Sequence, residues 1–139
     1  MDPRDALERG FRDAPFMVHL GVSLDGLGAG WCEASLPVLP WQTQQTGVVH
    51  AGVICALADH CAGAAATTQL QTGQFVVTVE FKLNLLRGAT GERLACRAVV
   101  LKPGQRFSIV ESEVWAELAG KRSLVAKLNA TMAVMQRDT

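Results

Sequence analysis

The stretch GVVHAGVICALADHCAGAAATTQL, residues 47–70, contains the one long helix that the sequence predicts. From His50 to Leu70 this segment is rich in alanine, the best helix former, and it contains no proline. It carries few charges, which indicates a helix that is buried on most sides rather than along one stripe. At 1.5 Å per residue, such a helix would be about 30 Å long.

After this helix the chain has the pattern of β-structure. Phe75–Leu85 alternates strictly, so that apolar side chains share one predicted face and Thr78 lies among polar side chains on the other. Three further strands are predicted at Glu92–Leu101, Arg106–Leu118 and Ser123–Met135. Tight turns separate them, so consecutive strands should be antiparallel.

Before the long helix we expect smaller elements. A short helix is predicted over residues 3–13, two strands at Phe16–Leu24 and Trp31–Val38, and a loop at 42–47. Together these elements predict one α+β domain over residues 1–139. In it, a curved antiparallel sheet of about six strands wraps around the central helix.

The composition limits the possible functions. Apolar residues make up 49% of the 139 residues and charged residues 19%, which is more apolar than an average soluble domain. We therefore expect some apolar surface to be buried between subunits. The formal net charge is zero and there is no basic run, whereas a nucleic-acid-binding protein needs a basic surface.

No apolar run approaches the roughly 20 residues that a membrane span requires. The polar residues 1–5 also lack the apolar region of a signal peptide, so we expect a cytoplasmic protein without a membrane partner. In that reducing compartment we expect buried thiols and no metal site. Neither a CxxC pair nor zinc-ligand spacing is formed by the four cysteines, Cys32, Cys55, Cys61 and Cys96.

Asp59 lies in the middle of the long helix, where aspartate is a poor helix former. Its neighbours three and four positions away on the same face are all small: Cys55, Ala56, Ala62 and Gly63. A carboxylate on such a face has open space in front of it, which a ligand or a partner backbone must fill. The pattern alone fits a functional carboxylate and a structural one equally well.

The start of the helix offers a second chemical group. The first N–H groups of a helix have no internal partner and carry the positive end of the dipole. They can polarise a carbonyl and stabilise the oxyanion that forms when the carbonyl is attacked. His50, nine residues before Asp59, is by itself best interpreted as a capping or core-edge histidine.

These residues resemble the signature of a known family. Gly47–Val53, followed by Leu57-Ala58-Asp59 and then by Gly63 and Ala65, is similar to the motif of the hotdog-fold acyl-CoA thioesterases of the PaaI type. The resemblance extends over nearly the whole chain, through four further segments: Phe16–Gly21 as the family's first strand, Thr78–Arg87 as the strand after the helix, Lys102–Arg106 as a turn, and Leu124–Ala126 in the last strand.

The resemblance implies hydrolysis of an aryl- or fatty-acyl-CoA. It implies that Asp59 is the catalytic carboxylate, acting as the nucleophile or as the general base that activates water. His50 and Gly52 match the histidine and second glycine at the helix start, whose N–H groups meet the thioester carbonyl. Ala51 replaces the first glycine; its N–H survives, and its methyl group would narrow the acyl pocket.

Further positions follow from the same resemblance. Gln44 matches an Asn or Gln that helps to hold substrate or water, and Thr78 matches a hydroxyl residue that reaches the site from the neighbouring subunit. The family implies a dimer at least, commonly a tetramer, with two sites shared across each dimer interface. Coenzyme A enters only as part of the substrate, with no other cofactor. Its phosphates have four candidate contacts: Lys82, Arg87, Lys102 and Arg106.

Two alternatives stay open. One is a hotdog-type hydratase or dehydratase. Such enzymes typically have a paired histidine and carboxylate motif or an H-F-P loop, and this sequence has neither. The other is a non-catalytic acyl-CoA-binding protein on the same scaffold, because a fold alone does not determine a function.

Overall fold

The computed structural model describes residues 1–138. The helices are α1 (Pro3–Arg12), α2 (Pro15–Leu20) and α3 (Ala51–Thr67), with a short 3-10 helix η1 (Pro40–Gln42). The strands are β1 (Ser23–Gly28), β2 (Trp31–Pro37), β3 (Gln74–Leu85), β4 (Arg93–Lys102), β5 (Phe107–Leu118) and β6 (Lys121–Gln136).

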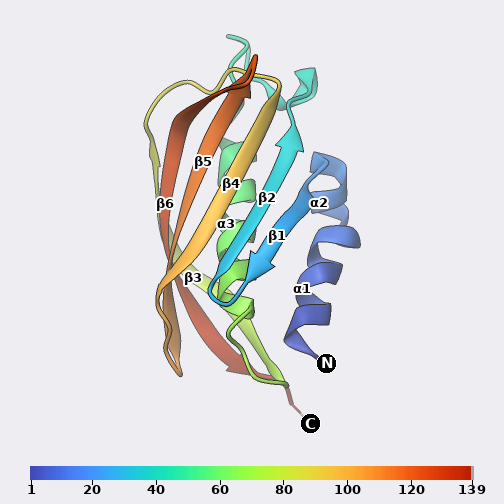
Figure 1. Ribbon diagram of the computed structural model, residues 1–139, viewed down its shortest axis with the longest axis vertical. Helices are drawn as coiled ribbons and strands as arrows, with labels where there is room; N and C mark the ends of the chain where they lie inside the picture. Colours follow the sequence, from blue (N-terminus) through green and yellow to red (C-terminus); the bar gives the residue numbers. More distant parts are fainter. Residues whose placement is uncertain (139) are drawn as a thin grey trace.

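The six strands form one antiparallel sheet in the order β1-β2-β4-β5-β6-β3. The helix α3 packs against one face of this twisted sheet and contacts β2 to β6 (Figure 1). The shorter helices α1 and α2 lie beside β1. This architecture confirms the α+β hotdog fold, with a central helix against a six-stranded sheet.

Small side chains bring α3 close to the sheet. Ala58, Ala62 and Ala65 on this helix are completely buried. The hydroxyl of Ser112, on β5, donates a 2.8 Å hydrogen bond to the carbonyl oxygen of Ala58 in the middle of α3. Such a close approach is possible only where side chains are small, and it fixes which face of α3 remains free for chemistry.

The prediction of a strand at Phe16–Leu24 is wrong for its first half. Residues Pro15–Leu20 form α2, and β1 begins only at Ser23. Pro15 occupies the first helical turn, and Gly21 ends the helix in the left-handed region with φ 78°. The segment Phe16–Gly21, which resembles the first strand of the family, therefore forms a helix up to Leu20 and a helix cap at Gly21 in this chain.

The strict alternation predicted for Phe75–Leu85 is interrupted by a β-bulge. Thr78 pairs with Met132, but Glu80 pairs with Thr131, so one extra residue lies between them. The bulge reverses which side chains face α3. Thr78 consequently lies on the side of α3, and not with Glu80 as the alternating pattern predicts.

Within residues 1–138, no helix combines the length and the hydrophobicity that crossing a membrane would require. All four cysteines are free thiols in this part of the chain. Three of them are buried, as expected, whereas Cys55 is only half-buried, because it lies on the face of α3 that the sheet leaves uncovered.

Candidate active site

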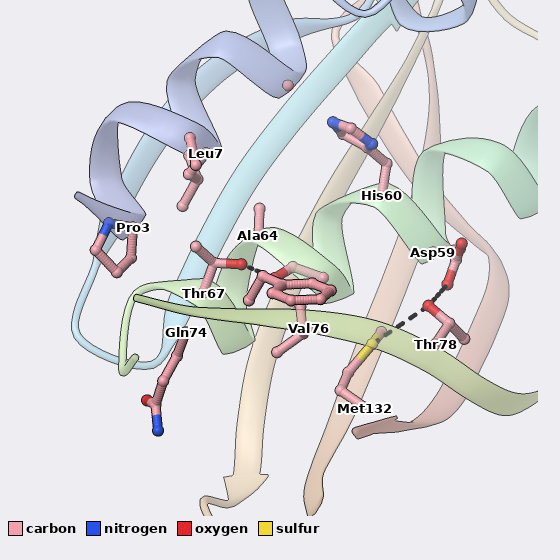
Figure 2. A pocket seen from close by; sticks show the side chains of 14 residues that line it. Pro3, Leu7, Asp59, His60, Ala64, Thr67, Gln74, Val76, Thr78 and Met132 are labelled. Carbon is pink, nitrogen blue, oxygen red and sulfur yellow. Dashed lines mark hydrogen bonds between the residues drawn. The ribbon is translucent and has the colours of Figure 1, made fainter. Parts of the chain in front are cut away.

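Asp59 lies on the uncovered face of α3 and lines a cavity of about 240 Å³ between α1, α3 and β3. Its Oδ1 accepts a 2.9 Å hydrogen bond from the hydroxyl of Thr78 on β3 (Figure 2). The same hydroxyl lies 3.3 Å from the sulfur of Met132 on β6. The carboxylate is therefore held by one hydroxyl and opens into a cavity rather than into packed protein.

The contact between Asp59 and Thr78 depends on the β-bulge in β3, which turns the Thr78 side chain toward α3. It is made within one copy of the chain. The resemblance implied that this hydroxyl reaches the site from a neighbouring subunit, and here it bonds the carboxylate of its own chain. Sequence alone gave no signal for this bulge, because the alternation of apolar and polar residues continues through it.

His50 caps the start of α3. The imidazole Nδ1 accepts a 2.8 Å hydrogen bond from the N–H of Gly52, and the backbone N–H of His50 donates to the carbonyl oxygen of Gln42 at 2.8 Å. The Gly52 N–H is therefore already bonded. Within residues 1–138 the N–H of Ala51 has no acceptor, so it is a free donor at this helix start.

The free donor and the carboxylate are far apart along the same helix. Ala51 and Asp59 are eight residues apart, which corresponds to about 12 Å along the axis at 1.5 Å per residue. Reacting groups must come within roughly 3–3.5 Å of the atoms on which they act. One carbonyl therefore cannot meet both groups in a single copy of the chain.

Gln44 is exposed in the loop before α3, where its backbone N–H donates to the carbonyl oxygen of Val48. Gln42, which no sequence pattern singles out, is only 1% exposed. The amide of Gln42 donates to the carbonyl oxygen of Leu20 at 3.1 Å, and its Oε1 accepts from the N–H of Leu39 at 2.9 Å. Gln42 thus fixes the loop that leads into His50, whereas Gln44 stays at the surface near the helix start.

The four basic residues do not gather in one copy. Lys102 and Arg106 flank the β4–β5 turn. This turn lies near the beginning of β3, because the Arg106 carbonyl accepts from the N–H of Val134, and Val134 pairs with the third residue of β3. Lys82 and Arg87 lie toward the other end of β3, roughly 20 Å along the strand. All four side chains are exposed.

His60 also lines the cavity, and it joins α3 to α1. The rings of His60 and Phe11 meet edge to face, with their centroids 4.5 Å apart and their planes at 86°. Gly10 is so close that a side-chain carbon there would lie 3.6 Å from the His60 Cε1. Burial lowers the pKa of His60, although the charge of Asp59 and the backbone of Gly10 oppose this shift.

This lowered pKa predicts a pH-dependent stability. As the pH falls, the unfolded chain takes up a proton on His60 near the ordinary pKa of about 6.5. The folded protein takes up this proton only at a lower pH. The free energy of unfolding should therefore fall as the pH drops below about 6.5. In thermal unfolding from about pH 7 to pH 5, His60→Gln, which cannot titrate there, should lose less stability than the wild type. Parallel curves for the two proteins would contradict the lowered pKa.

Cys55 lies one turn before Asp59 on the same face of α3. Burial and the charge of Asp59 raise the pKa of its thiol. A thiol with a raised pKa is protonated at neutral pH and is a poor nucleophile. Among residues 1–138 no three His, Cys, Asp or Glu side chains are grouped as metal ligands. Of Cys55 and Asp59, Asp59 is the better candidate for the reacting group, because its carboxylate opens into the cavity.

The sequence profile of the thioesterase superfamily matches residues 46–123, which is more than half of the chain. The match covers the helix start, Asp59 and all of β3. The chain belongs to the thioesterase superfamily.

This thioesterase superfamily chain is similar to several known proteins. A thioesterase family protein from Silicibacter pomeroyi has a TM-score of 0.93 and 34% identity, with 96% of this chain and 98% of the other covered. A thioesterase from Haemophilus influenzae has a TM-score of 0.84 and 26% identity, with 95% and 90% covered. A curated H. influenzae protein, provisionally named an esterase, is 30% identical over 99 residues, which are 71% of this chain and 72% of that protein.

Proposed function

We propose that this thioesterase superfamily protein hydrolyses aryl- or fatty-acyl-CoA thioesters, as a member of the PaaI type. The observation that carries the proposal is the carboxylate of Asp59, held at 2.9 Å by Thr78 and open to a cavity that suits an acyl group. The free N–H of Ala51 at the start of α3 supports it, because a helix start polarises a carbonyl oxygen.

Two chemical routes use the same residues. In the first, the Asp59 oxygen that Thr78 leaves free attacks the thioester carbon, the CoA thiolate departs, and water then cleaves the acyl anhydride. In the second, Asp59 takes a proton from water, and the resulting hydroxide attacks the carbon directly. Either route needs the N–H of Ala51 at the developing oxyanion. Both release the free acid and the thiol of coenzyme A, and neither needs a further cofactor.

The proposed reaction needs two copies of the chain. Because Ala51 and Asp59 lie about 12 Å apart along α3, the donor of one copy must serve the carboxylate of another. The strand β3 offers a surface for this second copy, since it is at the edge of the sheet. Its exposed apolar side chains are Val77, Val79, Phe81 and Leu85. A long apolar edge strand favours pairing with another chain, so we propose a homodimer at least.

The same dimer accounts for the basic residues. Within one copy, Lys102 and Arg106 lie far from Lys82 and Arg87. Antiparallel pairing of two β3 strands brings the beginning of one strand toward the end of the other. This pairing brings Lys102 and Arg106 of one copy toward Lys82 and Arg87 of the other. The phosphates of coenzyme A would then be held by both copies, and we propose that two such dimers form a tetramer.

Release of free thiol tests the proposed function. The purified protein is offered a panel of aryl- and fatty-acyl-CoAs, and the thiol is measured with a chromogenic reagent. We expect turnover at ordinary enzyme rates, about 1–10³ s⁻¹, for at least one acyl group. Addition of water to an enoyl-CoA without thiol release would support the hydratase alternative instead. Tight binding of every acyl-CoA without turnover would support the non-catalytic one.

A further inference from the structure

Two cavities lie on either side of the first half of α1. The first, of about 240 Å³, contains Asp59, and the second, of about 280 Å³, lies between α1, the β1–β2 turn and the end of α3. Three residues line both cavities: Pro3, Leu7 and Thr67. The two cavities are therefore neighbours, and these three side chains form the wall between them.

The wall has one adjustable part. Pro3 is a rigid ring at the start of α1, and the Thr67 hydroxyl is held by a 2.8 Å bond to the carbonyl oxygen of Gly63. Leu7 is an aliphatic side chain that reaches from α1 toward Ala64 and Thr67 on α3 (Figure 2). It is 6% exposed and lines both cavities, so its side chain stands between them.

Size and lining indicate what each cavity can hold. A cavity of roughly 150 Å³ accommodates one benzene ring, so the first cavity is large enough for a single substituted ring or a compact acyl group. The second cavity has a leucine-rich interior of Leu7, Leu27 and Leu70, which suits the end of an alkyl chain. Its charged residues are Asp2 and Arg4, from the start of the chain.

Gly63 leaves the first cavity open beside Asp59. It is one turn after Asp59 on the same face of α3, and a side-chain carbon added there would meet nothing within 4 Å. Glycine in a helix interior is destabilising by roughly 0.5–1 kcal/mol relative to alanine, so packing does not explain its presence. Gly63, the carboxylate of Asp59 and Leu7 all line this one cavity.

From these observations we infer that the two cavities form one acyl channel which Leu7 interrupts, so that Leu7 sets the length of the acyl group accepted. This inference rests on the proposed thioesterase function. Acyl groups that fit beside Gly63 react, whereas a long alkyl chain meets Leu7 before its carbonyl reaches Asp59. Removal of the Leu7 side chain opens the way into the leucine-rich second cavity.

The test compares kcat/KM for phenylacetyl-CoA and dodecanoyl-CoA in the wild type and in Leu7→Ala. We expect the ratio to shift toward dodecanoyl-CoA by about tenfold or more, because a few methylene groups in an apolar pocket change discrimination by that amount. Leu94→Ala is the matched control, since Leu94 is a buried leucine on β4 that lines neither cavity. Should Leu7→Ala fail to fold, Leu7→Val should shift the ratio in the same direction.

A second variant acts from the other side of the channel. Gly63→Leu places a side chain in the open space beside Asp59, and should lower the ratio of kcat/KM for phenylacetyl-CoA to that for acetyl-CoA by about tenfold or more. An unchanged ratio in Leu7→Ala or Leu7→Val, with an active wild type, would overturn the channel and leave the proposed function standing. A wild type that releases no thiol from any acyl-CoA would overturn both.

Discussion

Asp59→Asn is expected to lower kcat for thioester hydrolysis by about 10²–10⁴-fold without unfolding the protein. The amide cannot attack a carbonyl or take a proton from water. Its oxygen can still accept the hydrogen bond that the Thr78 hydroxyl donates at 2.9 Å in the wild type. The measurement is steady-state thiol release, together with thermal unfolding and binding of an unreactive acyl-CoA analogue.

The matched control is Glu92→Gln, which makes the same chemical change at an exposed position before β4. It should leave kcat within about twofold of the wild type, because a surface substitution away from the site has little effect. If Asp59→Asn retained near-normal turnover while still folding, the carboxylate would have no part in the reaction. Loss of folding in that variant would instead indicate that Asp59 is a structural residue.

Ala51→Pro is expected to lower kcat by about 10²–10³-fold, the usual effect of removing one oxyanion donor. Proline has no N–H, and the first helical position is where a helix tolerates it best. The backbone before it is already suitable, since His50 has φ −61° and ψ 137°, in the extended region that a residue before proline prefers. The helices α1 and α2 of this chain also begin with proline.

Ala51→Gly is the control for this change, because it retains the N–H and removes only the methyl group. It should keep kcat close to that of the wild type, and it also tests whether the methyl group narrows the acyl pocket. Circular dichroism and thermal unfolding establish that Ala51→Pro preserves the helix. Full activity in a folded Ala51→Pro variant would assign the carbonyl to another donor, such as the Gly52 N–H released from His50.

Much of the fold could be predicted because its signals are local. The alanine-rich segment before Leu70 and the period-two strands after it have patterns that only a helix and strands explain. The helix α2 escaped prediction because Pro15–Leu20 is too short to show a helical period. Its apolar residues fit a strand equally well, and the deciding signals were Pro15 at the start and Gly21 at the end.

The candidate site could be predicted only in part. Asp59 and the helix start are close in sequence, so their pattern and the family resemblance identify them. The bulge that turns Thr78 toward Asp59 has no local signal, because Val79 continues the apolar alternation. The cavity wall at Leu7 depends on how α1 packs on α3, more than 50 residues later in the chain, and no short pattern encodes such a contact.

The central claim is that the carboxylate of one copy acts with the helix-start amide of another. Co-expression of Asp59→Asn and Ala51→Pro in equal amounts tests it directly, since each variant alone is nearly inactive. A mixed dimer would join the Asp59 of one chain to the Ala51 N–H of the other at one of its two sites. We predict that thiol release recovers to about a quarter of the wild-type rate per chain. A mixture no more active than the two variants measured separately would contradict the shared site.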